Sequence, residues 1–199
     1  AAHVADKEYK GLNAFDSLVD FYKRLKELEE TFDKPHLLGC IITEGGTAPN
    51  IVPDRATLKA TVRALDTDYL ENVMLPQIKE LAAEVAKDHH TPVETEHYEP
   101  LYKNMINNAA LNVYFIEAFN ALHEEFGVYE EEDAEGSTDV GNVSHVTRAA
   151  QPEIAIGYHI NAHTPEFATA ANSDFAYIQA LTGAKAMVAV AAEVLFEKR

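Results

Sequence analysis

The chain has 199 residues, of which 47% are hydrophobic and 25% are charged, and this composition excludes disordered and fibrous proteins. Its formal net charge of -17 makes nucleic acids and anionic membrane surfaces poor partners, because both carry charge of the same sign. No apolar run of membrane-spanning length is recognisable, and the opening AAHVADKEYKG lacks the basic and apolar regions of a signal peptide, so we expect a cytoplasmic protein without nucleic-acid or membrane partners.

The first segments combine one helical pattern with one apolar strand. Apolar residues recur at helical spacing from Leu12 to Leu28, and Asn13 stands where a helix cap belongs. The run HLLGCIIT, residues 36–43, predicts a buried strand. It contains the chain's single cysteine, Cys40, so no intrachain disulfide can form, and its apolar surroundings favour a small buried hydrophobe over a nucleophile.

A glycine- and proline-rich turn separates this strand from a second one. GGTAPNIVPD, residues 45–54, leads into ATLKATVRA, residues 56–64, whose alternation puts Arg63 on the polar face, away from the side that helices would cover. Helical spacing then returns over residues 67–88, where Pro76 predicts a kink or a late start.

Two short extended segments complete the pattern of the first half. VETEHY, residues 93–98, alternates like a strand, and AAHV, residues 1–4, stands in front of the first helix. The resulting order of strand, helix, strand, strand, helix, strand favours a ferredoxin-like α+β layer, in which both helices cover one face of an antiparallel sheet.

The second half is poorer in regular elements. A helix is predicted over residues 108–126, a polar loop at EGSTDVGNVSH, residues 135–145, a strand around EIAIGY, residues 153–158, and a long terminal helix from about Ser173. That last helix is rich in alanine, which suits close packing, and we expect it to be buried on one side in a larger α/β body. Two helices and one or two strands are few for an independent core.

Several segments together carry a specific family resemblance. AAHV, KEYKGLNAFDSL, GGTAPNIVPDRATLKATVRA, GSTDVGNVSH and HTPEF follow one another as in metallopeptidases and amidohydrolases of the M20 family, and the sequence resembles its aminoacylase-1-like or aminobenzoyl-glutamate-hydrolase-like branch. Members of that family are roughly twice this long. The resemblance implies that the front half, with most metal ligands and the glutamate general base, is missing from a truncated, processed or split protein.

The resemblance also implies a fold class and a division of the chain. The class is α/β in the α+β sense: a ferredoxin-like lid or dimerisation domain over residues 1–100, followed over residues 101–199 by the C-terminal part of an α/β zinc-peptidase-like catalytic domain. In the family the lid domains pair, so a homodimer through this domain is expected.

A histidine near the end of the chain is the predicted metal ligand. As a lone histidine, His163 in HTPEF would more often be an ordinary surface or core residue. The resemblance implies that it is the last ligand of a centre of two divalent ions, most naturally zinc, with manganese or cobalt as alternatives that ligand type does not separate. Glu166 is close enough in sequence to orient the loop or the ring.

Three residues of the first half are implied to contact substrate. Residue by residue, His3 would be a frayed terminal histidine, Asn50 a turn residue and Arg63 a solvated strand residue. The resemblance implies instead that His3 reaches the partner subunit's active site and hydrogen-bonds the developing oxyanion, although Glu8 replaces the usual proline after it. It implies that Asn50 and Arg63 line the substrate site, with the Arg63 guanidinium gripping a carboxylate.

The polar loop at residues 135–145 is either a tight connection or part of the same site. The resemblance implies that it borders the metal centre, with Gly136 and Ser137 as the foremost substrate contacts because small side chains let a ligand approach the backbone. We therefore expect this loop and His163 to face one cleft.

These expectations define one main hypothesis and one alternative. The main hypothesis is an amidohydrolase or peptidase that cleaves an N-acyl amino acid or a dipeptide-like substrate with a free carboxylate, with two metal ions bound mostly by the missing half. This chain alone would then be inactive. The alternative is a non-catalytic dimerisation or ligand-binding module, whose function would survive without metal.

Overall fold

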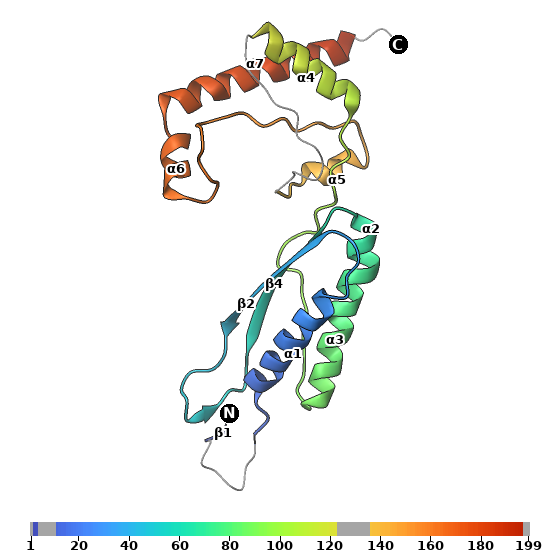
Figure 1. Cartoon of the computed structure of the whole chain (residues 1–199), viewed down its shortest axis with the longest axis vertical. Helices are drawn as coiled ribbons and strands as arrows, with labels where there is room; N and C mark the ends of the chain where they lie inside the picture. The colour runs from blue at the N-terminus through green and yellow to red at the C-terminus, as the bar shows by residue number, and fades with distance from the viewer. Residues whose placement is uncertain (1, 4–10, 123–135, 197–199) are drawn as a thin grey trace. The chain divides into compact units, whose positions relative to one another are not determined.

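The computed structural model describes residues 2–3, 11–122 and 136–196, which belong to two compact units, Ala1–Asn104 and Met105–Arg199 (Figure 1). Each unit is considered by itself. The predicted assignment of residues 1–100 to a lid and of residues 101–199 to a catalytic domain stays a prediction at this stage.

The first helix, α1, spans Ala14–Glu29 and begins as the sequence predicts. The side-chain oxygen of Asn13 accepts hydrogen bonds from the backbone N–H groups of Phe15 and Asp16, at 3.0 and 3.2 Å. This cap satisfies two donors that the first helical turn leaves without a partner. The helix packs against α3, which spans Leu75–Asp88.

The second helical region of this unit is continuous but changes its winding before Pro76. A short α2, Thr67–Tyr69, leads into the π-helical turn η1, Leu70–Met74, and then into α3. Proline has no N–H for the usual i→i−4 bond, so it is tolerated only within the first turn of a helix. The N–H of Leu75 bonds the carbonyl of Leu70 instead, which gives the wider turn. The structure therefore shows an irregularity before Pro76, in the form of a wider turn, rather than a late start, because the helical region already begins at Thr67.

The described strands of this unit form two antiparallel pairs. β2, His36–Glu44, pairs with β4, Thr57–Ala64, with Leu37 opposite Arg63 and Ile42 opposite Leu58. β1, Ala2–His3, pairs with β3, Ile51–Val52. The predicted class of helices with an antiparallel sheet is confirmed, but these strands do not join into one four-stranded layer.

The predicted strand at residues 93–98 is wrong, because this segment has no regular secondary structure. Tyr98 nevertheless lies beside β4, where its hydroxyl is 3.5 Å from the carbonyl oxygen of Ala60 and 3.3 Å from the hydroxyl of Thr61. The segment has few apolar side chains with which to hold a sheet register, and the prolines at positions 92 and 100 cannot donate to a ladder.

The core of the first unit lies between its helices and one face of the β2–β4 pair. Phe32, Tyr69, Leu70 and Met74 form its buried centre, and Val62 and Ala64 of β4 pack against it. β2 exists as predicted, but its predicted burial is wrong: Leu38 is buried, whereas Leu37 is 54% and Ile41 63% exposed. Helices cover only one face of this strand pair, so alternate residues face outward.

The second unit consists of four described helices. They are α4, Ala109–Ala121; α5, Val140–Ser144; α6, Pro165–Ala171; and α7, Asp174–Phe196. Its core is the contact of α4 with α7, made by Ala118, Phe119, Ala186 and Val190. The predicted helices are confirmed, although residues 123–126 of the first lie outside the described residues.

The predicted strand at residues 153–158 is wrong, because this segment is irregular. Its Ile154 packs against the α4–α7 core instead, and an isolated parallel bridge joins Asn107 to Ala149. No described strand forms a ladder with this apolar run. The buried contact of Ile154 therefore determines the path of the segment instead.

The terminal helix also corrects the membrane argument made from the sequence. α7 has 23 residues and is apolar enough to cross a bilayer by length and composition alone. Core helices of soluble proteins pass the same test, so this single helix is weak support for a membrane span. Because this apolar run consists largely of alanines and β-branched residues, its length was not recognised from the sequence.

Candidate functional site

Strand pairing brings two of the predicted site residues together in the first unit. The backbone of His3 lies opposite Ile51 in the β1–β3 pair, and Asn50 is the residue before Ile51. Asn50 lies in the turn that precedes β3 and is exposed. The predicted oxyanion donor and one predicted substrate residue therefore occupy neighbouring backbone positions, although they are 47 positions apart in the sequence.

The turn that carries Asn50 depends on two glycines. A Cβ on Gly45 would lie 2.8 Å from the ring of Phe15, and Gly46 has φ of 118° with Pro53 packed against it. Only glycine adopts such a φ without strain, and only a missing side chain allows the ring to approach so closely. The N–H of Ala14 bonds the carbonyl of Pro53 at 3.0 Å, which ties the start of α1 to this turn.

A hollow of about 440 Å³ lies against the same turn. Its lining comes from the start of α1 and from the turn itself: Asn13, Phe15, Gly45, Gly46, Thr47, Ala48, Pro49, Ile51, Val52 and Pro53. None of these lining residues is charged, and most of them are aromatic, aliphatic or proline residues, so the hollow offers a ligand shape and apolar contact rather than charge.

Arg63 lies elsewhere in the same unit. It is exposed near the end of β4, opposite Leu37, whereas the turn with Asn50 leads into the start of β4 near Thr57. Arg63 is six positions after Thr57 along the strand, about 20 Å at the usual rise. Within one unit the structure therefore does not bring Arg63 together with Asn50 and His3.

The polar loop of the second unit is anchored at one end and open at the other. The buried hydroxyl of Ser144 accepts from the N–H of Ile106 at 2.9 Å and donates to the carbonyl of Gly141 at 2.6 Å. At the other end Gly136 and Ser137 are exposed, and nothing lies within 4 Å of where a Cβ on Gly136 would be. The two predicted contacts are thus accessible to a ligand.

His163 occupies an unusual backbone conformation directly before α6. Its φ is 63°, a left-handed value that few non-glycine residues adopt, and its side chain is exposed. The next residue, Thr164, caps α6 by accepting from the N–H of Phe167 at 3.2 Å and also donates to the carbonyl of Asn161 at 2.8 Å. His159, which sequence reasoning passed over, is also left-handed, with φ of 56°.

The part of the chain that the structure describes does not gather the donors needed for a metal centre. Within residues 2–3, 11–122 and 136–196, no three His, Cys, Asp or Glu side chains are placed to hold one ion. His163 is thus a single candidate ligand, and two ions would need donors from outside these residues. The predicted shared cleft of His163 and the polar loop stays a prediction.

A polar network that the sequence did not reveal joins α1 to the end of α3. The Asp20 carboxylate accepts from Nε2 of His89 at 3.0 Å and pairs with Arg24 at 2.8 Å, and Arg24 also pairs with Asp88 at 2.9 Å. The hydrogen bond from His89, followed by the contact with Arg24, lowers the pKa of Asp20. This network connects two helices rather than lining a cavity.

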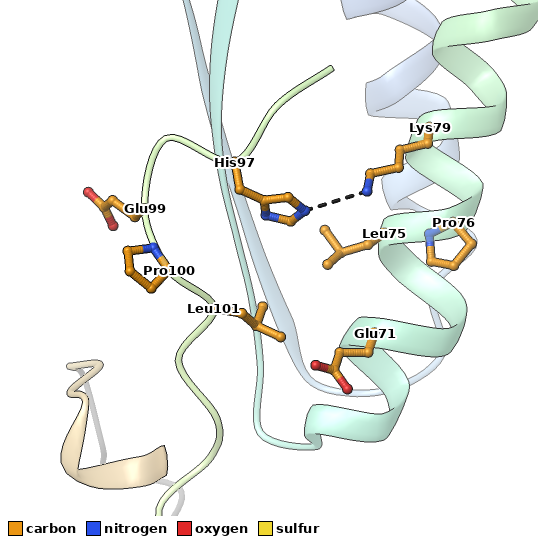
Figure 2. A pocket seen from close by; sticks show the side chains of 8 residues that line it. All are labelled: Glu71, Leu75, Pro76, Lys79, His97, Glu99, Pro100 and Leu101. Atoms are coloured by element: carbon orange, nitrogen blue, oxygen red, sulfur yellow. Dashed lines mark hydrogen bonds between the residues drawn. The ribbon is translucent and has the colours of Figure 1, made fainter. Parts of the chain in front are cut away.

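A second hollow, of about 540 Å³, lies between α3 and the segment after it (Figure 2). Figure 2 shows Leu75 and Leu101 pointing into the space beneath His97 and Lys79, whose nitrogen atoms are 3.4 Å apart. Its rim carries groups of both signs, Glu71 and Glu99 as well as Lys79, so its charge selects no ligand class.

Comparison with known proteins gives these positions a context. Residues 1–92 match the family profile described as the peptidase dimerisation domain of the M20 group. The chain is 32% identical over 204 residues to the Xaa-Arg dipeptidase of Mus musculus and 30% identical over 200 residues to that of Homo sapiens. Each match covers 99% of this chain but only 46% and 45% of the relatives, so the chain spans about half their length. The chain is therefore similar to M20 peptidases along 99% of its length, and its first 92 residues match the dimerisation domain of that family.

Proposed function

We propose that the protein to which this chain belongs is a metal-dependent peptidase or amidohydrolase that cleaves the amide bond of an N-acyl amino acid or a dipeptide-like substrate. The observation that carries the proposal is the similarity along 99% of the chain to two Xaa-Arg dipeptidases, together with the dimerisation domain. Because the chain spans about half of those relatives, activity belongs to the longer protein, and this chain alone is inactive.

The proposed roles divide between binding and stabilisation of charge. The Arg63 guanidinium holds the substrate carboxylate with two parallel N–H donors, and Asn50 adds an amide contact. His3 donates a hydrogen bond to the oxyanion that develops on the substrate carbonyl oxygen. The exposed backbone at Gly136 and Ser137 accommodates the substrate chain.

His163 is the residue of this chain that would hold a metal ion. Neutral imidazole is a good ligand for zinc. The left-handed backbone at His163 supports a functional role for this loop, because strained residues cluster at functional sites. Two divalent ions, zinc or else manganese or cobalt, would supply a hydroxide nucleophile and polarise the amide carbonyl when bound. Their other ligands and the general base belong to the part of the protein outside this chain.

A homodimer through the first unit is part of the proposal. Among the described strands β2 has β4 as its only neighbour, so its other edge presents backbone groups to a partner. Helix α1 lies against this strand, where Lys26 Nζ is 3.4 Å from the carbonyl oxygen of Leu38. Val19 and Tyr22 are partly exposed on α1, and Tyr22 is one turn before the buried Leu25, so the apolar stripe of this helix extends to its surface and suits a second copy. In such a dimer His3 can serve the partner's site, which fits its separation from Arg63.

The test uses the longest natural polypeptide that contains this sequence. We expect about two divalent ions per chain, hydrolysis of N-acyl amino acids or dipeptides, and loss of activity when the ions are chelated. Arg63→Ala should raise KM for a carboxylate substrate about tenfold or more, whereas Arg55→Ala, an exposed arginine paired with Glu44, should leave it unchanged. A full-length dimer without metal or hydrolysis would favour the alternative, a dimerisation or ligand-binding module.

A further inference from the structure

The β2–β4 pair has an outer face that no described helix covers. By the strand register, this face carries Leu37 opposite Arg63, Gly39 opposite Thr61 and Ile41 opposite Lys59. Their neighbours on the strands, Leu38 and Val62, belong to the inner side: Leu38 is buried, and Val62 packs against the core. Figure 1 shows α1 and α3 together beside the strand pair.

This outer face combines apolar side chains with a gap between them. Leu37 and Ile41 are exposed, and Gly39 between them has no side chain, with nothing within 4 Å of where its Cβ would lie. Alternate residues of a strand are about 7 Å apart, so the two apolar side chains border a notch with a bare backbone floor. Such a notch suits an uncharged side chain of a ligand.

Two cationic side chains lie on the same face of the strand pair. Arg63 lies across the strands from Leu37, with Cβ atoms about 5 Å apart in such pairs. Lys59 lies across from Ile41, with its ammonium 5.5 Å from the centre of the Tyr98 ring. Both ends of the notch therefore repel a basic ligand side chain.

The carboxylates at the two ends of the strand pair already have cationic partners. Glu44 pairs with Arg55 at 3.4 Å and accepts from the hydroxyl of Thr57 at 3.2 Å. Asp66 pairs with Lys34 at 2.6 Å and accepts from the N–H of Tyr69 at 3.2 Å. A basic substrate side chain would have to displace one of these partners to be neutralised.

We propose that the outer face around Leu37, Gly39 and Ile41 binds the side chain of the substrate residue whose carboxylate Arg63 holds, and selects an apolar side chain over a basic one. The inference rests on the proposed function, because it uses Arg63 as the carboxylate clamp. Because Arg63 lies across from Leu37, a carboxylate bound there would bring the adjacent side chain close to Leu37 and the notch at Gly39. This preference for an apolar residue would differ from that of the two relatives, whose names specify arginine.

The test compares substrates that differ in a single side chain. With the full-length metalloenzyme and three dipeptides that share an N-terminal residue and end in leucine, alanine or arginine, kcat/KM should be about tenfold or more higher for leucine than for arginine. Gly39→Val fills the notch without colliding with the protein, because nothing lies near the added Cβ. It should lower kcat/KM for the leucine substrate about tenfold and leave the alanine substrate within about twofold.

Two further variants separate the side-chain site from the clamp. Leu37→Ala should reduce the leucine-to-arginine ratio severalfold, whereas Leu12→Ala, which truncates a leucine of similar exposure away from this face, should not change it. If Arg63→Ala raises KM but Gly39→Val and Leu37→Ala leave the side-chain preference unchanged, or if arginine is the preferred residue, the inference is wrong and the proposed function stands. If Arg63→Ala has no effect on KM, the carboxylate clamp itself fails.

Discussion

The two units of the chain bury their apolar side chains in different ways. The largest fully buried side chains are Leu25, Met74 and Val85, and all three belong to the first unit. In the second unit the fully buried residue of the core cluster is Ala186, and the larger side chains between α4 and α7, such as Phe119, keep some exposure. The large buried side chains of the first unit therefore favour an independent core. The described residues of the second unit bury fewer large side chains completely, so its core is expected to be less stable.

Helix α7 explains the difference. Its buried residues Ala176, Thr182, Ala186 and Val190 form one stripe, and on the opposite side Tyr177, Leu181, Val188 and Leu195 are exposed. A helix that is apolar on both sides is usually covered on both sides. An amphipathic helix such as α1 needs only one covering element, which its own unit supplies.

The largest expected effect is the loss of a large buried side chain from the first unit. Met74→Ala removes a fully buried side chain between η1 and the strand pair, so it should lower the free energy of unfolding of that unit by about 2–5 kcal/mol. Leu65→Ala, at an exposed leucine just after β4, should cost less than about 1 kcal/mol. Urea denaturation of the two variants measures both values, and equal losses would contradict the proposed location of the core.

A smaller effect should separate the two faces of α7. Ala186→Leu adds volume where α7 meets α4, so it should destabilise the second unit by about 1–3 kcal/mol. Ala191→Leu makes the same change at an exposed position of α7 and should stay within about 0.5 kcal/mol. Thermal unfolding followed by circular dichroism distinguishes the two, and equal shifts would mean that the exposed face is covered after all.

Helix caps provide a comparison in which the two units should behave alike. Asn13 caps α1 and Asn108 caps α4, where its side-chain oxygen accepts from the N–H of Leu111 at 3.1 Å. Asn13→Ala and Asn108→Ala should each lower the free energy of unfolding by about 1 kcal/mol, because a cap is a local interaction. A much larger loss for Asn108→Ala in urea titrations would show that the thin core of the second unit depends on its caps.

The sequence predicted elements best where a local signal exists. The capped start of α1, the irregular helix at Pro76 and the start of α7 follow from residues within one or two turns. The wrong strands, at residues 93–98 and 153–158, had alternating or apolar patterns but form no ladder with any described strand, and strand pairing is a non-local property. The exposure of Leu37 and Ile41 was missed for the same reason: an apolar run does not reveal how many of its faces are covered.

The residues of the candidate site stay a prediction, and their geometry could not be read from the sequence. Motif resemblance singled out His3, Asn50, Arg63 and His163, and the β1–β3 pairing of His3 beside Asn50 needed coordinates. The placement of Arg63 near the far end of β4 follows from a register that sequence alone does not determine. The left-handed backbone at His163 has no reliable sequence signal, because histidine adopts this conformation only occasionally.

The smallest expected effect concerns acid, and it should fall on the first unit. Among the described carboxyl groups, those whose pKa is lowered are Asp20, mainly by its hydrogen bond from His89, and Asp66, mainly by its hydrogen bond from Lys34. A carboxyl group with a pKa below its ordinary value of 3.8 stabilises the folded state above that pH, and this contribution is lost as the pH falls through the lowered value. Melting temperatures measured from pH 6 down to about pH 2 should therefore fall less steeply in Asp20→Asn and Asp66→Asn than in the unchanged chain. Asp139→Asn, an exposed aspartate of the second unit, is the matched control and should leave the slope unchanged; if it flattens the slope equally, the acid sensitivity does not belong to the polar contacts of the first unit.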